Sequence, residues 1–329
     1  MRTFRTSYWI LLGVALLAVA TIAVASGPVS VPLPAVIAAL QGRGDPTAIA
    51  IVRDLRLPRV VLGALVGAGL GGSGAMLQGT LRNPLAEPYL LGVSGGAAVG
   101  AVVAFALGAG SAAAITLAAF AGSVVAVFVT LAVGRTGGRA TRGDLRTLLI
   151  AGVIVGAFAN AVIMVSLASA EPNRIRGALW WMMGSATDAT WSRVAWLAGS
   201  VLLVGGAVIY WAREIDILAL GEDTAVSLGV DADRAGRRAF ILAAILAAAT
   251  VAAAGLVGFV GLVVPHIARA LGLRAHRPLI LAAGLIGGTL VVAADLAART
   301  LASPIELPLG AITALLGVPF FLVQLRRAA

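Results

Sequence analysis

The 329-residue sequence contains no lysine and no cysteine, and it has only two histidines. Without lysine the chain cannot form a Walker A phosphate loop, which needs its lysine on the nucleotide phosphates. Without cysteine it has no disulfide, no thiolate nucleophile and no thiolate metal site. Two histidines, His266 and His276, exclude a histidine-rich metal centre. We therefore expect no metal or cofactor on this chain, and any ATP used must be bound, with its Mg, by another chain.

Charged residues are also scarce, at 12% of the chain, whereas hydrophobic residues make up 60%. This composition is typical of a polytopic membrane protein, in which each span takes about 20 apolar residues. The apolar runs predict ten membrane-spanning helices, near residues 8–25, 59–81, 92–108, 112–134, 145–169, 192–211, 236–255, 259–272, 278–301 and 308–326. We expect an all-α fold forming one transmembrane domain over residues 1–329.

Two of these runs are ambiguous. Residues 24–27 weakly resemble a signal-peptidase site, but the preceding run is long for a signal peptide, so we interpret it as a retained first span. The run at 259–272 is short and contains Pro265, so we expect a helix break there and no regular crossing of the bilayer.

The net charge of +10 comes from 24 arginines, which lie between the apolar runs. A basic balance is common in nucleic-acid-binding proteins, but this distribution favours a role in orienting helices, and we expect no nucleic acid. With the N-terminus inside, 16 of the 24 arginines fall in inner segments, which predicts N- and C-termini in the cytoplasm. The eight outside include Arg53, Arg56 and Arg59 before the second span and Arg299 at the outer end of the ninth.

Glycines recur every four residues in the second and third spans, at Gly63, Gly67 and Gly71 and again at Gly92, Gly96 and Gly100. This spacing lets helix backbones approach closely in lipid. Asn83 and two prolines separate the two spans. The pattern predicts a tight hairpin of two helices packed against each other.

The longest polar interior segment spans residues 213–238. It predicts two short helices, one leading to Gly221 and one from Glu222 to Leu228 that stops at Gly229. Asp223 and Thr224 are placed to supply first-turn charge or capping groups. Such a loop could simply connect two spans or form a docking surface for a soluble partner, and spacing alone leaves both open.

Seven stretches occur in an order that resembles the FecCD family, the type II ABC importer permeases for ferric siderophores, haem and cobalamin. They are residues 56–59 (RLPR), 83–88 (NPLAEP) with 91–96 (LGVSGG), 181–184 (WMMG), 219–222 (ALGE) through 228–230 (LGV), 258–266 (GFVGLVVPH), 294–295 (AD) and 306–310 (ELPLG).

The resemblance implies a homodimer of ten-helix subunits in a bacterial or archaeal cytoplasmic (inner) membrane. Two ATPase subunits would drive transport, and an outer binding protein would deliver a metal chelate, so the chain itself is no enzyme. Family members relate spans 2–5 to spans 7–10 as an inverted repeat. Here a glycine-rich helix followed by a proline-marked break, at Pro84 and Pro265, is the trace of it.

The resemblance also implies roles for single residues. Arg56, Arg59 and Arg299 match positions that dock acidic side chains of the binding protein, through exposed guanidiniums. The alternatives are interfacial snorkelling or a local pair, such as Asp295 with Arg299 one turn later. The coupling helix that fits into the ATPase matches Gly221, Glu222, Asp223, Thr224, Ala225, Leu228 and Gly229.

Asn83 and Leu85 match the family's inner gate, although Asn83 could equally cap a helix. A second family constriction falls at residues 143–146, where this sequence reads GDLR and departs from the Ser/Thr-rich pattern. Arg176 matches an arginine near the outer mouth of the path, where it would meet a substrate anion or act as an interfacial anchor. For His266 we favour a backbone-bonded side chain at the helix break over a haem ligand.

The residue inventory argues against three other function classes. An ion-coupled secondary transporter usually carries ionisable residues in mid-membrane, and the predicted spans are nearly free of them. A passive channel would need a charged ring or filter, and none is recognisable. An intramembrane enzyme would need a base, a nucleophile and a metal that this inventory cannot supply.

Overall fold

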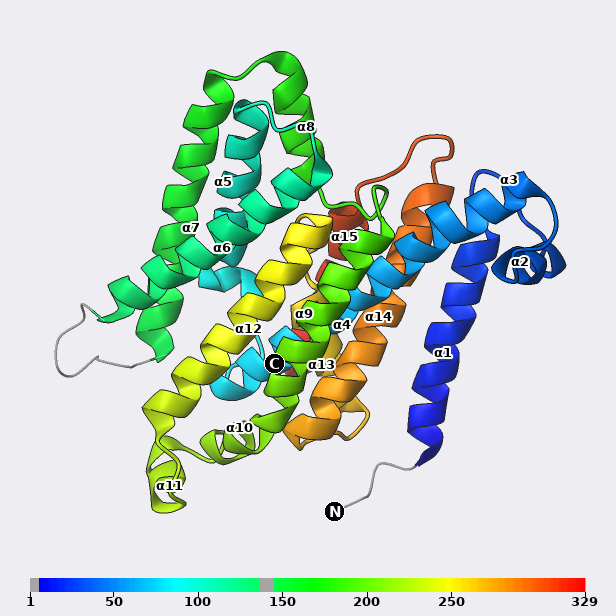
Figure 1. Ribbon diagram of the computed structural model, residues 1–329. Coiled ribbons are helices and arrows are strands. Elements are labelled where there is room, and N and C mark those ends of the chain that lie inside the picture. Colours follow the sequence, from blue (N-terminus) through cyan, green and yellow to red (C-terminus); the bar gives the residue numbers. More distant parts are fainter. Residues whose placement is uncertain (1–5, 136–144, 329) are drawn as a thin grey trace.

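The computed structural model describes residues 6–135 and 145–328, and every regular element within these ranges is helical (Figure 1). The elements are α1 (Thr6–Ala25), α2 (Leu33–Leu40), α3 (Pro46–Ile49), η1 (Ala50–Arg56), α4 (Leu57–Thr80), η2 (Pro88–Leu91), α5 (Val93–Ala106), α6 (Ala112–Arg135), α7 (Leu145–Ala168), α8 (Pro172–Met182), α9 (Trp191–Tyr210), α10 (Ala212–Leu218), α11 (Glu222–Ser227), α12 (Ala232–Ala254), α13 (Val260–Ala270), α14 (His276–Thr300) and α15 (Leu309–Ala328). Four of the arginines assigned to inner segments, Arg2, Arg5, Arg139 and Arg142, and two residues of the second constriction, Gly143 and Asp144, lie outside the described residues.

Each of the ten predicted spans coincides with one helix, so the all-α prediction is confirmed. Seven helical stretches are long and apolar enough to cross a membrane, counting residues 46–80 as one. Three further apolar helices are shorter, at residues 93–106, 260–270 and 309–323. The short predicted span at 259–272 is one of these, as expected.

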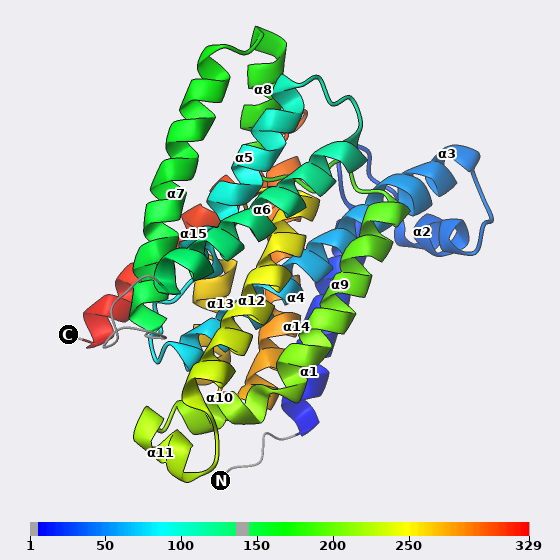
Figure 2. The ribbon, with the colours of Figure 1, turned by 60° about the vertical axis from the view of Figure 1, so that its left-hand side comes forward.

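The helices run between two ends of the molecule (Figures 1 and 2). One end carries α10 and α11 together with the start of α1, and we call it the α11 end. The opposite end carries α2, α3 and α8, and we call it the α8 end.

Helix α4 is the centre of the packing, because it contacts α9, α12, α13 and α14. Small residues make these contacts possible. A Cβ atom on Gly67 would lie 2.0 Å from the carbonyl oxygen of Gly287 in α14, and one on Gly74 would lie 1.9 Å from that of Gly261 in α13. The glycine spacing in this helix therefore does serve close backbone approach, as predicted.

The sequence predicted that the glycines of α4 would pack against α5, and this prediction is wrong. Instead of packing against α4, helix α5 packs on α6 and α7, and the three form a group visible in both ribbon views (Figures 1 and 2). Its own glycines face α6, where a Cβ on Gly96 or Gly100 would come within 2.4 Å and 2.1 Å of backbone oxygens. The expected hairpin of two packed helices does not form, because each glycine face is matched to a helix other than its sequence neighbour.

The segment between α4 and α5 meets the segment between α12 and α13. The Tyr89 hydroxyl donates to the carbonyl of Val257 at 2.9 Å and accepts from the Val257 N–H at 2.7 Å. The Glu87 carboxylate accepts from the Phe259 N–H at 2.9 Å. These bonds join the α4–α5 segment to the α12–α13 segment. The sequence predicted these two segments as equivalent breaks of an inverted repeat.

The second break lies before Pro265, at residues 255–259, and α13 continues through the proline. Pro265 has no N–H to donate to the Gly261 carbonyl four residues earlier. The Gln78 side-chain amide donates to that oxygen instead, at 3.2 Å. A side chain from α4 thus replaces the missing bond, which is why Pro265 does not end the helix.

The packing of α4 predicts that Gly67→Ala destabilises the protein, because the new methyl group meets the Gly287 backbone. Overpacking of this kind costs about 1–3 kcal/mol. Gly199→Ala in α9 is the matched control, since nothing lies within 4 Å of its Cβ position. We expect a lower thermal unfolding temperature in detergent for Gly67→Ala only. Equal temperatures for both variants would contradict the close approach of α4 and α14.

Candidate functional site

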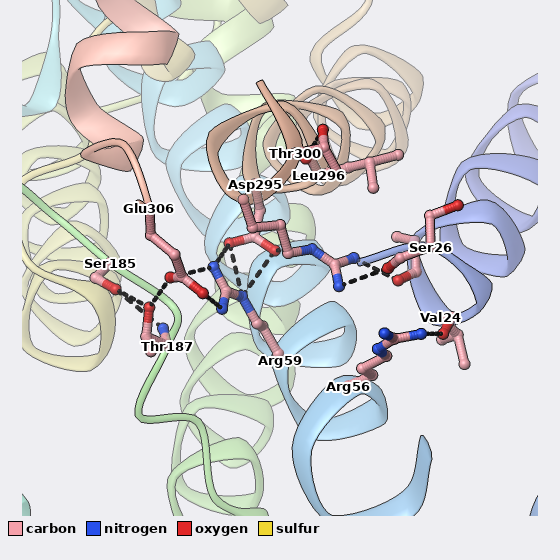
Figure 3. Close-up of polar contacts among 12 residues, drawn as sticks. Val24, Ser26, Arg56, Arg59, Ser185, Thr187, Asp295, Leu296, Thr300 and Glu306 are labelled. Atoms are coloured by element: carbon pink, nitrogen blue, oxygen red, sulfur yellow. Dashed lines mark hydrogen bonds and ion pairs between the residues drawn. The ribbon is translucent and has the colours of Figure 1, made fainter. Parts of the chain in front are cut away.

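A buried ionic cluster lies at the α8 end (Figure 3). Arg59 of α4 pairs with Asp295 of α14 at 2.9 Å and with Glu306, in the α14–α15 connection, also at 2.9 Å. Arg299 lies one turn after Asp295 and approaches it at 3.5 Å. The cluster ties α4, α14 and the segment leading to α15 together.

Two arginines bind the end of α1. Arg56 donates to the carbonyls of Val24 at 2.9 Å and Ala25 at 2.8 Å, and Arg299 donates to that of Ser26 at 3.0 Å (Figure 3). The last carbonyls of a helix have no partner within it, and cations stabilise that end. These bonds hold the end of α1 against α4 and α14.

The three predicted docking arginines are therefore not exposed. The exposed fractions of Arg56, Arg59 and Arg299 are 6%, 8% and 3%. The expectation of exposed guanidiniums is wrong, and the alternative local pair of Asp295 with Arg299 is present. Asp295 and Glu306 lie 236 and 247 residues after Arg59, so only the fourfold spacing of Asp295 and Arg299 signalled any of these contacts.

Glu306 is the most accessible member of the cluster. Burial acts to raise the pKa of its carboxyl, but hydrogen bonds from Arg59 and from Thr187 at 2.7 Å outweigh it, so that the pKa lies below its usual value. A lowered folded-state pKa contributes stability above the unfolded value, and this contribution is lost as pH falls through the folded one. At neutral pH Glu306 is therefore a paired carboxylate.

A cavity of about 770 Å³ opens beside the cluster. Its wall contains aromatic and aliphatic side chains together with a few polar ones. Glu306 and Thr187 belong to the lining, as do Trp180 and Trp181 of α8. Arg176, the predicted substrate contact, lies about one turn before Trp180 in α8. It is exposed and does not line this cavity.

At the opposite end, α10 is bonded to two long helices. Glu214 pairs with Arg238 of α12 at 2.9 Å. Asp216 accepts from the backbone N–H of His276 at 2.9 Å and contacts its Nδ1 at 2.6 Å, at the start of α14. Helix α10 is therefore fixed to both α12 and α14.

Helix α11 follows as predicted, starting at Glu222 and stopping before Gly229. Gly221 and Gly229 have φ angles of 115° and 79°, which favour glycine at both ends. No side-chain cap bond forms at its start, so Asp223 contributes first-turn charge only, and Thr224 does not cap. Ala225 is buried.

The surface of this loop is unusual for a solvent-facing connection. Leu220, Val226 and Leu228 are 66%, 65% and 57% exposed. They lie beside the acidic side chains of Glu222 and Asp223, which are exposed as well. Exposed apolar side chains rimmed by charge mark an interaction site.

An ion pair joins α11 to the segment that follows α4. Arg82 approaches Glu222 at 3.3 Å. In the same segment the Asn83 side chain accepts from the Leu85 N–H at 2.9 Å, so it stabilises the turn, and Leu85 is 50% exposed. The predicted gate residues and the predicted coupling helix are thus neighbours.

Within the described residues no group of three or more histidine, aspartate or glutamate side chains is arranged to hold a metal ion. His266 lies edge-on against Phe320, with ring centroids 5.9 Å apart. The part of the chain that the structure describes contains no backbone hydrogen bond from its ring, so that prediction for His266 is not met.

The long apolar helices are those of a multi-pass membrane protein, and comparison with known proteins places it in the class of transport proteins. Comparison with known proteins gives the family. The cobalamin import system permease protein BtuC of Halobacterium salinarum is 44% identical over 290 residues, covering 88% of this chain and 77% of that protein. The hemin transport system permease protein HmuU of Yersinia pestis is 39% identical over 276 residues, covering 82% and 81%.

A solved chain agrees with these relatives. It comes from an inward-facing conformation of a transporter assigned to the metal-chelate type ABC class, with a TM-score of 0.87, 28% identity, and coverage of 98% of this chain and 100% of that one. The chain belongs to the FecCD transport family, which it matches over residues 15–327. It is a permease subunit, the transport component of an ABC importer, which implies ATPase and binding-protein partners.

The ionic cluster predicts that Arg59→Gln destabilises the fold, because Asp295 and Glu306 lose their shared partner. Removing one member of a buried pair costs about 3–5 kcal/mol. Arg53→Gln is the control, since Arg53 is exposed and carries no side-chain ion pair in the described structure. Thermal unfolding in detergent compares the two. A stable Arg59→Gln protein that fails only in binding-protein capture would contradict the structural role.

Proposed function

We propose that this chain conducts a metal chelate of the cobalamin, haem or ferric-siderophore type across a bacterial or archaeal cytoplasmic membrane. The named substrates of the relatives support this class. The chain acts as a homodimer with two ATPase subunits on the α11 end and a binding protein on the α8 end. Residues 1–329 act as one domain, with both termini in the cytoplasm.

The observation that carries this proposal is the construction of the α10–α11 loop. Its outer surface is exposed and apolar at Leu220, Val226 and Leu228, as a docking surface requires. Its base is bonded to α12 and α14 through Arg238 and His276. A loop that only connected two spans would need neither feature.

The loop also contacts the proposed gate. When ATP binding moves the ATPase, α11 moves with it and pulls on Arg82 through Glu222. Asn83 and Leu85 follow Arg82 directly, and the bonds of Tyr89 to Val257 extend the connection to the start of α13. Rigid-body movement of packed elements is the usual way to transmit such a change.

Docking of the binding protein at the α8 end takes a form different from direct contact. The guanidiniums of Arg56, Arg59 and Arg299 are occupied inside the subunit. We propose that they support the docking surface by holding the end of α1 and the 301–308 connection in place. Family membership decides against the secondary transporter, and the buried Asp295 is paired with Arg59 and Arg299.

Uptake measurements test the proposal. Cells lacking the chain receive it intact or with Glu222→Arg or Gly229→Trp, and labelled haem, cobalamin and ferric siderophores are supplied. We expect one chelate to enter with the intact chain and to be lost with either variant. Uptake that survives both variants but stops with the proton gradient would contradict ATP-driven transport.

The Arg82–Glu222 pair predicts a second result. Arg82→Glu should reduce chelate uptake severalfold while ATPase binding is kept, because two acids then repel across the contact. Combining Arg82→Glu with Glu222→Arg restores opposite charges, and we expect partial recovery relative to Glu222→Arg alone. If the losses of uptake in the double variant were additive, the Arg82–Glu222 pair would not couple α11 to the gate segment.

A further inference from the structure

We infer that Arg193 is the cation that binds the transported chelate in the cavity at the α8 end, and that the chelate is a flat, conjugated molecule carrying a carboxylate. This rests on the proposed function. It assigns the role to a residue other than Arg176, which matches the family pattern but is exposed outside the cavity.

Arg193 occupies an unfavourable position for a structural arginine. It lies in the first turn of α9, where its backbone N–H is bonded by the capping Thr190 at 3.3 Å. The positive end of the helix dipole is there, so a cationic side chain is disfavoured. Helix geometry alone gives no reason for an arginine at this position.

Its guanidinium also lacks direct partners. Among the described residues Arg193 has no side-chain hydrogen bond or ion pair, although it is partly buried in the cavity wall. Asp188, which also lines the cavity, interacts with it only at longer range. Arg56 and Arg59, by contrast, are fully engaged.

Two acids also line the wall. Asp188 lies beyond ion-pair distance of Arg193 in the described structure, and Glu306 is already neutralised. Glu306 is held by Arg59 and by Thr187, so it offers little negative charge to a ligand. Arg193 is therefore the group in this lining that is available to form a bidentate bond with a carboxylate.

The aromatic part of the cavity wall favours a flat ring system in the ligand. Phe105, Trp180 and Trp181 line the cavity from two helices, α5 and α8. Aromatic side chains stack on flat conjugated rings, and the volume of about 770 Å³ falls within the range of small-molecule sites. A planar metal chelate with a carboxylate at its edge would stack on the aromatic side chains and bind Arg193 through the carboxylate.

The test uses the permease–ATPase complex in lipid nanodiscs, without binding protein, and two probes with the same ring. Haemin carries two carboxylates, and haemin dimethyl ester carries none. Binding is followed by quenching of tryptophan fluorescence. We expect haemin to bind more tightly than its ester, and Arg193→Gln to weaken haemin binding roughly ten- to a hundredfold while leaving the ester unchanged.

Two variants serve as controls. Arg176→Gln should bind haemin as the unaltered protein does, and Arg193→Lys should keep part of the affinity because it keeps the charge. Equal binding of haemin and ester, or a loss with Arg176→Gln instead, would overturn the inference.

The uptake experiment separates this inference from the proposed function. Loop-dependent uptake of cobalamin or a siderophore, with no carboxylate-dependent binding at Arg193, overturns the inference and leaves the importer intact. Failure of every chelate in the uptake experiment overturns the proposed function, on which the inference rests.

Discussion

Close backbone contact around α4 is the constraint on which the rest of the structure depends. Glycines let this helix touch α13 and α14 at distances that no side chain allows. In lipid, helix association has no hydrophobic driving force, so van der Waals packing at such contacts stabilises it instead. Because α4 is fixed in this way, the residues at its two ends are held in defined positions. One end presents Arg59 to the ionic cluster, and the other leads into the segment that carries Arg82 and Asn83.

Much of this arrangement was predictable from local pattern. Apolar length located the helices, and Gly221 and Gly229 located the ends of α11, because both effects act within a few residues. The partners of Gly67 and Gly96 were not predictable, since glycine spacing shows that a close neighbour exists without showing which helix it is. The same holds for Arg59, whose acids lie 236 and 247 residues away. For Arg193 the local signal was limited to its place in the first turn of α9, because its significance comes from the cavity that it lines.

The two ends of the molecule differ in which side chains they expose. At the α11 end, short helices keep apolar side chains exposed and are anchored from below by Asp216 and Glu214. At the α8 end, Arg56, Arg59 and Arg299 are buried and bonded within the subunit. Arg193 in the cavity wall has no side-chain hydrogen bond or ion pair among the described residues. Partner contact is thus proposed for the apolar surface of α11, and ligand contact for Arg193 in a cavity wall that also carries Asp188 and Glu306.

The bonds at the end of α1 have a consequence for how the chain is made. The carbonyls of Ala23 and Ser26 receive their donors from Arg299, more than 270 residues later in the sequence. During synthesis the first helix enters the membrane long before α14 exists, and until then these carbonyls depend on water or lipid headgroups. Arg56 can bond Val24 and Ala25 early, but the end of α1 is fully bonded only after α14 has been inserted next to it.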